Sequence, residues 1–306
     1  MKHLFFSKKM YCIFWATMWM ISLPLMTKAA EPGSPVLSIT GERTSGAEID
    51  DADSAGKAEK TCSGVSLTLP VHFDTQARLE LKFRADQISY DWDDAEKIVF
   101  SNGREPWDKL RSADMRLKYI HNYTRYWSAL AGFNLGAAWE DETRDSYSYG
   151  GYLAAVCRTD FNLSYFIGAG VIRKPEDVIY IPVLGMRWNS MAENGSGWSV
   201  SLGMPRTEIR YSFNEILAVY CNAKMDMKTY RLKDENKVSP SGLLEIKGFT
   251  GGLFADIHLM KPLRLSLGMT YLFGREWEIQ DKDGETIQDV DIEDALGASV
   301  GLSWIF

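Results

Sequence analysis

Apolar and polar residues alternate along most of the chain from about residue 63 to residue 306. In the final segment one phase is apolar and the other is almost entirely small or polar. The apolar phase consists of Leu296, Ala298, Val300, Leu302, Trp304 and Phe306. A period of two puts successive side chains on opposite faces, so the pattern predicts a β-strand whose faces meet different surroundings. The strand is about twice the usual length of ~5–6 residues.

Similar segments recur throughout residues 63–306 and are separated by polar turns. Helical periodicity does not persist in any of them, with a possible short exception near "DWDDAEKIVF", so the chain is predicted to be all-β. The strand count depends on "GMPR", between Trp188 and Tyr211, which fits a kink in one strand or a turn between two. Two strands there would require another in the region 86–112 to keep the number even. We expect twelve strands, with ten to fourteen open.

Alternation alone fits either a membrane barrel or a soluble β-sandwich. Three features favour a closed antiparallel transmembrane β-barrel over residues 63–306. The strands run ~10–15 residues, aromatic residues gather at the ends of the apolar faces, and tight turns alternate with long charged loops. A secreted soluble β-sandwich that binds a partner is the alternative.

The N-terminal residues indicate export. Basic Lys2, Lys8 and Lys9 precede an apolar run over 10–26, and small residues follow. This order predicts a signal peptide over residues 1–29, cleaved after Ala29 or Ala30. An uncleaved anchor is the alternative, since the run only just reaches the lower limit for a membrane-spanning helix. Residues 30–62 are rich in small and charged residues and predict a flexible periplasmic leader.

Charge and cysteine usage narrow the class further. The formal charge is −7; residues 1–29 hold four lysines and no acidic residue, so their removal leaves about −11. An acidic exported protein is not expected to bind nucleic acid. Cys62, Cys157 and Cys221 then remain, an odd number whose spacing fits neither a disulfide framework nor a metal site. Cys157 and Cys221 fall in apolar phases, and the pairing of Cys62 stays open. We expect no cofactor and no metal.

The final stretch "VGLSWIF" resembles the last strand of bacterial outer-membrane β-barrel proteins, which ends on an aromatic residue after alternating apolar positions. "PVLGMRW" and "GWSVSLGMPRTEIRY" also resemble a porin-like group of outer-membrane barrels without an assigned activity. The resemblance implies an outer-membrane location, with outer-membrane lipid and lipopolysaccharide as surroundings. It also implies that the barrel-assembly machinery recognises Val300, Leu302, Trp304 and Phe306. The oligomeric state stays open.

The sequence offers little evidence for a catalytic site. There is no HExxH and no glycine-rich phosphate loop, and "DKDGETIQD" at 281–289 has its glycine at the fourth position rather than the sixth that an EF-hand needs. The alternative function is an outer-membrane lipid or lipid A hydrolase, with His258 or His121 as the base. His258 lies two residues from Asp256, but no serine, histidine and acid converge by spacing. We predict no catalytic residue.

The polar phases, which would face the lumen, hold more cations than acids. The cations are Arg78, Lys82, Arg84, Arg116, Lys118, Arg187, Arg210, Lys224, Lys228 and Arg264, and the acids are Glu80, Glu208, Asp226, Asp256 and Glu293. A water-filled lumen of this composition would favour anions. Alternatively, the charges pair across the lumen and block it. The predicted function is therefore a passive small-solute channel with a weak anion preference, or a structural barrel, without catalysis.

Overall fold

The computed structural model describes residues 34–50, 56–73, 76–101, 103–159, 161–192 and 195–306. The predicted signal peptide and its cleavage site lie outside the described residues. Within these ranges, no helix is long and apolar enough to cross a membrane.

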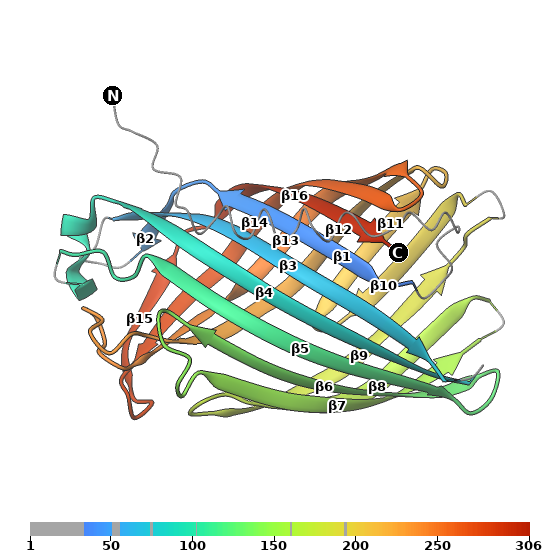
Figure 1. Cartoon of the computed structure of the whole chain (residues 1–306), viewed down its shortest axis with the longest axis horizontal. Helices are drawn as coiled ribbons and strands as arrows, with labels where there is room; N and C mark the ends of the chain where they lie inside the picture. Colours follow the sequence, from blue (N-terminus) through green and yellow to red (C-terminus); the bar gives the residue numbers. More distant parts are fainter. Residues whose placement is uncertain (1–33, 51–55, 74–75, 102, 160, 193–194) are drawn as a thin grey trace.

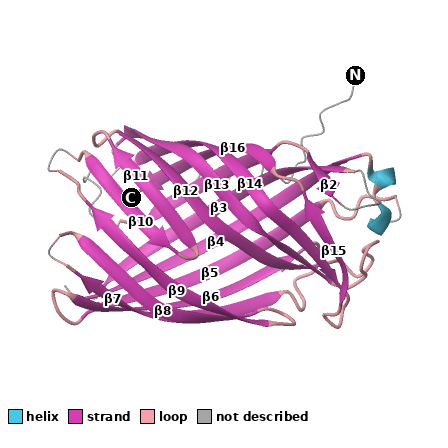
Figure 2. Cartoon of the chain, turned by 180° about the vertical axis from the view of Figure 1, so that it is seen from behind, coloured by secondary structure: helices cyan, strands magenta, loops and turns pink. Residues whose placement is uncertain are grey.

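One sheet contains all sixteen strands of the described residues, and sequence neighbours in its wall run antiparallel (Figure 1, Figure 2). The strands of the first half are β1 (Val36–Thr44), β2 (Ala47–Asp50), β3 (Lys57–His72), β4 (Ala77–Asp93), β5 (Lys109–Asn122), β6 (Trp127–Trp139), β7 (Tyr147–Arg158) and β8 (Leu163–Arg173). Those of the second half are β9 (Val178–Asn189), β10 (Gly197–Gly203), β11 (Arg206–Ser212), β12 (Leu217–Arg231), β13 (Leu243–Met260), β14 (Leu263–Gln280), β15 (Thr286–Ile292) and β16 (Ala295–Ile305). Two short 3₁₀ helices, η1 (Ala95–Lys97) and η2 (Val99–Ser101), follow β4.

The sheet closes on itself through β1. This strand pairs with β16 from Val36↔Ile305 to Thr44↔Gly297, and with β3 along its other edge. The ring therefore consists of fourteen strands, namely β1, β3 to β14, and β16. The closed antiparallel all-β barrel is confirmed, and a β-sandwich, which needs two separate sheets, is excluded.

Fourteen strands lie within the expected range but exceed the favoured number of twelve. The "GMPR" stretch joins two separate strands, β10 and β11. The additional strand that makes the number of wall strands even is β1. No additional strand forms within 86–112 of the described residues, where η1 and η2 are found instead.

The flexible leader expected over 30–62 is wrong for β1, for β2 and for the start of β3. In β1 the apolar phase is short, with Leu37 and Ile39 opposite Trp304 and Leu302. The other phase is polar, and the Ser38 and Ser303 hydroxyls hydrogen-bond at 2.8 Å. The small, polar and charged residues of β1 are compatible with a strand of the barrel wall. Only the outward-facing residues of such a strand need to be apolar.

The outward phases form an apolar belt between two levels of aromatic side chains. Leu153, Ile167 and Met269 are exposed near its middle. Exposed aromatics at one end of the barrel include Phe73, Tyr123, Tyr126, Trp127, Phe161, Trp188, Trp198, Phe213 and Phe306, and at the other Tyr147, Tyr149, Tyr180, Phe249 and Tyr271. An apolar band flanked by aromatic girdles is the outer surface of a transmembrane barrel.

The two ends of the barrel differ. At the turn end, short connections such as 213–216 and 261–262 join the strands, and β16 ends. At the loop end lie the long connections 94–108 and 232–242, together with β2 and β15. These two strands pair at Ile49↔Ile292 and extend the sheet beyond the ring.

Candidate functional site

Strands β4 and β5 present a ladder of charged side chains to the lumen. Their register pairs Glu80 with Lys118, Lys82 with Arg116, and Arg84 with Asp114. These residues alternate with the outward-facing Phe83. Arg78 continues the ladder toward the turn end. The structure therefore places these predicted lumen residues on the inner face.

The predicted lumen charges of β11 to β14 are paired. Arg210 binds Asp256 at 2.8 Å and Glu208 at 3.4 Å. Arg264 lies 4.0 Å from Asp256, which is only 2% exposed and also accepts a hydrogen bond from Ser266. In this half of the lumen, Arg210 and Arg264 each have a carboxylate within 4.0 Å.

Two further pairs bring β12 into this network. Lys224 binds Asp226 on its own strand at 2.9 Å. Lys228 reaches across the lumen to Asp114 of β5, at 2.7 Å. The expected pairing across the lumen is therefore present at Lys228.

The ladder on β4 and β5 keeps an excess of positive charge. Among the described residues, Arg78, Lys82, Arg116, Lys118 and Arg187 have no carboxylate within 4.0 Å. Lys82 interacts electrostatically with Arg84, Arg116 and Arg206, and Lys118 with Arg78 and Arg187. Among the described residues, Glu80 is an acid that interacts electrostatically with both lysines. Like charges gathered around one acid create a positive potential in the lumen.

Glu293, expected on a lumen face, lies elsewhere. It follows β15 at the loop end, where its carbonyl accepts a hydrogen bond from Arg275 at 3.0 Å. The alternating phase of β16 does not extend back to it, because β16 begins at Ala295.

An apolar seal fills part of the lumen at the loop end. Trp92, Trp107 and Trp277 pack with ring centroids 5.2–5.7 Å apart. Trp92 Nε1 donates a hydrogen bond to the Trp107 carbonyl at 2.6 Å. The other fully or nearly fully buried apolar residues of the seal are Ala47, Ile49, Ala58, Tyr90, Ile98, Leu110, Ala138, Tyr230, Leu232, Leu244, Ile279, Val290, Ile292 and Ala295. Sequence analysis missed this cluster, although two tryptophans flank the "DWDDAEKIVFSNGREPW" loop.

The seal forms because one part of the wall folds inward. Strands β10 and β11 are short, so the last wall partner of β12 on that side is Arg206, opposite Lys224. Beyond this point β12 crosses the lumen, and Arg231 pairs with Trp139 of β6. We call residues 225–231, 243–247 and 275–280 of β12 to β14 the flap. One face of the flap carries Tyr230, Leu244 and Trp277 into the seal.

The other face of the flap borders a polar cleft of about 390 Å³. Met227, Thr229 and Glu245 line it from the flap, and Lys174 and Ile179 line it from the β8–β9 turn and β9. Ile179 lies on the lumen side of β9, because its neighbour Tyr180 faces outward. The cleft therefore lies inside the barrel, beside the seal.

Ion pairs organise the flap face of the cleft. Lys247 lies 2.5 Å from Glu278, 3.3 Å from Glu276 and 4.0 Å from Glu245. A bulge at Gly248 separates these charges from Phe249 of the aromatic level, so they lie outside the apolar belt. The hydrogen bond from Lys247 lowers the pKa of Glu278 to about 2. Burial lowers the pKa of Lys247, but its bond to Glu278 and the charge of Glu245 outweigh burial and raise it.

Carboxylate oxygens of Glu276, Glu278 and Asp289 lie within 4.8 Å of one another. Lys247 lies within 3.3 Å of the first two, so the cluster already has a cationic partner.

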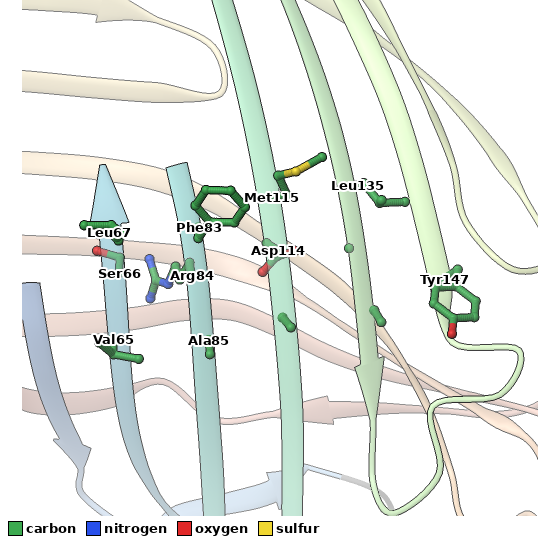
Figure 3. A pocket seen from close by; sticks show the side chains of 13 residues that line it. Val65, Ser66, Leu67, Phe83, Arg84, Ala85, Asp114, Met115, Leu135 and Tyr147 are labelled. Atoms are coloured by element: carbon green, nitrogen blue, oxygen red, sulfur yellow. The ribbon is translucent and has the colours of Figure 1, made fainter. Parts of the chain in front are cut away.

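A shallow depression of about 470 Å³ lies on the outer wall over β3 to β7 (Figure 3). Small residues Ala85, Ala113 and Ala137 lie along it, flanked by Phe83 and Tyr147. These residues belong to the outward phases, so the depression faces the surroundings of the barrel and not the lumen.

The histidines do not assemble a catalytic triad within the described residues. His121 contacts Tyr119 and packs against Tyr123. Asp256, the acid nearest to His258 in sequence, is engaged by Arg210 and Ser266. Cys62, Cys157 and Cys221 are free thiols, which answers the open pairing of Cys62.

Of the predicted assembly residues, Val300, Leu302 and Trp304 lie on the outer face of β16, and Phe306 follows the last residue of this strand. Val300, Leu302 and Phe306 are exposed, and the Phe306 N–H donates to the Pro35 carbonyl at 3.0 Å. Their recognition by the assembly machinery stays a prediction.

A family model described as a domain of unknown function (DUF6268) matches residues 46–305. The chain belongs to this family. No curated protein sequence matches it. In fold, the family member has the closed antiparallel barrel and the apolar belt of outer-membrane barrels, as the sequence resemblance implied.

Several solved barrels are similar to this family member. The KdgM porin has 9% identity and a TM-score of 0.40, with 89% of this chain and 99% of that chain covered. The NanC porin has 10% identity and a TM-score of 0.38, with 88% and 100% covered. The P. putida toluene transporter TodX has 11% identity and a TM-score of 0.39, with 92% and 93% covered. With scores this low, the fold assignment rests on the strand register of the chain itself.

Proposed function

We propose that this protein is an outer-membrane β-barrel that admits small anionic solutes to its lumen and does not catalyse a reaction. The apolar belt and the aromatic levels support placement in a membrane, and the expected signal peptide supports export. In the outer membrane, the turn end faces the periplasm and the loop end faces outward, as short and long connections do in such barrels.

The observation that carries this proposal is the incomplete neutralisation of the β4–β5 ladder. A structural barrel would gain most from fully paired lumen charges, as found on β11 to β14. In the part of the chain that the structure describes, Arg78, Lys82, Arg116 and Lys118 instead have no carboxylate within 4.0 Å. A positive lumen raises the local concentration of anions and favours their passage.

Uptake of solutes by proteoliposomes tests this proposal. Vesicles with the purified protein should take up a small organic anion faster than a neutral solute of equal size. Replacing Lys82 and Arg116 together with Gln should remove most of that difference. The matched control is Lys97→Gln with Arg104→Gln, which removes two charges from the 94–108 loop. Equal anion uptake before and after loss of Lys82 and Arg116 would contradict the proposal.

A further inference from the structure

The wall of the barrel has a step at its loop end. The β10–β11 hairpin ends at Met204–Pro205, and beyond it β9 and β12 have no strand between them. The β8–β9 turn, residues 174–177, lies over this step. Its Lys174 Nζ binds Glu245 of the flap at 2.5 Å. The turn and the flap thus close the step without main-chain pairing between β9 and β12.

This ion pair is buried, although it joins two loop-end elements. Lys174 is 9% exposed and Glu245 is 2% exposed. Charged side chains are seldom this buried, and an isolated surface pair would hold the two elements only weakly. Burial limits screening by salt, so the pair fixes the turn against the flap more firmly.

The pair lies at one border of the polar cleft. The cleft lies beside the apolar seal, because the seal occupies the opposite face of the flap. A Cβ on Gly284, in the β14–β15 turn, would touch the Glu176 side chain, so this turn also approaches the β8–β9 turn. Access to the cleft from the loop end therefore depends on where the β8–β9 turn lies.

We propose that Lys174 and Glu245 form a latch that closes the loop-end mouth of the lumen, and that release of the β8–β9 turn opens the polar cleft. This inference rests on the proposed function in treating the lumen as a solute route. The flap and the seal stay in place when the latch opens. Lys247 remains beside Glu245 at 4.0 Å, so its carboxylate keeps a cation after Lys174 leaves. Lys174 itself can turn to Asp177, which lies 3.7 Å away and is exposed.

Thiol accessibility tests the latch without requiring transport. The parent variant for this test has Cys62, Cys157 and Cys221 replaced by Ser. Its Met227→Cys substitution places a single thiol on the flap side of the cleft. A membrane-impermeant charged maleimide is added to the folded barrel in detergent. With Lys174→Met, the labelling rate should rise at least about tenfold, the change expected for a site that moves from closed to mostly open. Lys174→Arg, which keeps the ion pair, should label as slowly as the parent.

Two controls separate the latch from a general loosening. Lys282→Met removes an exposed cation of the β14–β15 turn and should leave the rate unchanged. Heat-modifiable mobility on a gel shows that each variant retains the closed barrel, and Glu245→Gln serves as the second opening variant should Lys174→Met not fold. Equal labelling rates in the parent and in the folded opening variants would overturn the latch. Absence of anion uptake together with latch-dependent labelling would overturn the proposed function and leave the latch standing.

Discussion

Arg231 of β12 and Trp139 of β6 are bridge partners across the lumen, although five strands separate β12 from β6 in the wall. The Glu140 N–H donates to the Arg231 carbonyl at 2.8 Å and secures the contact. The short β10–β11 hairpin makes this possible, since it leaves the loop-end part of β12 without a partner on its β11 side. The barrel is consequently divided at its loop end into an apolar seal and a polar cleft.

The seal should dominate the stability of the loop end. Trp107 is 1% exposed and packs against three other aromatic rings. Trp107→Ala should lower the free energy of unfolding by about 3–5 kcal/mol, because it leaves a large cavity. Urea unfolding in detergent measures this change. Glu105→Ala, in the same loop but exposed, should stay within about 0.5 kcal/mol of the parent. A Trp107 variant as stable as the parent would mean that the seal contributes nothing.

The outer face of β7 should tolerate no charge. Leu153 lies near the middle of the apolar belt and is exposed. Leu153→Arg should lower the free energy of unfolding in lipid by about 2–4 kcal/mol, because the guanidinium must enter hydrocarbon. Ser148→Arg on the inner face of the same strand is the control and should cost far less. Equal costs for the two variants would contradict the assignment of inner and outer faces.

The Lys247–Glu278 ion pair should persist well into acid. The pKa of Glu278 is lowered from 4.5 to about 2, so its stabilising contribution is complete above about pH 4.5 and is lost as pH falls toward 2. NMR of the labelled Glu278 carboxyl in the folded barrel measures its titration. Lys247→Met should move the midpoint up toward 4.5. A midpoint near 4.5 in the parent would show that the pair does not form.

The apolar face of β16 should govern insertion. Replacing Trp304 and Phe306 with Ser, or deleting Phe306, should leave the protein in the periplasm or degraded, because the assembly machinery would lose its recognition residues. Fractionation and heat-modifiable mobility follow the outcome. Ile305→Ser changes the same strand on its opposite face and should insert normally. Normal insertion of the Trp304 and Phe306 variant would refute the assembly role.

Period-two patterning was sufficient to predict the wall and the ladder. Because strand side chains alternate, the faces of Lys82, Arg116 and Lys224 followed from local sequence alone. The same pattern in β1 was obscured, since only Leu37 and Ile39 mark its apolar phase among small and charged residues. The surrounding composition therefore suggested a flexible leader.

The seal and the latch could not be predicted in this way. Trp107 and Trp277 lie 170 positions apart in the sequence and meet only because β12 to β14 fold inward. Lys174 and Glu245 are 71 positions apart, and neither stands in a motif. Alternation reports which face a residue occupies, but it carries no information on which distant elements approach one another. The contact between Trp107 and Trp277 and the ion pair between Lys174 and Glu245 are both of this second kind.

The sign of the reversal potential in a planar bilayer tests the central claim most directly. With the purified protein and a tenfold gradient of potassium chloride, we predict a reversal potential displaced toward the chloride equilibrium potential, as the unneutralised β4–β5 ladder requires. Opening the latch with Lys174→Met should increase the current. A reversal potential displaced toward the potassium equilibrium potential, or no current from the parent and the opened variant, would contradict an anion-favouring lumen.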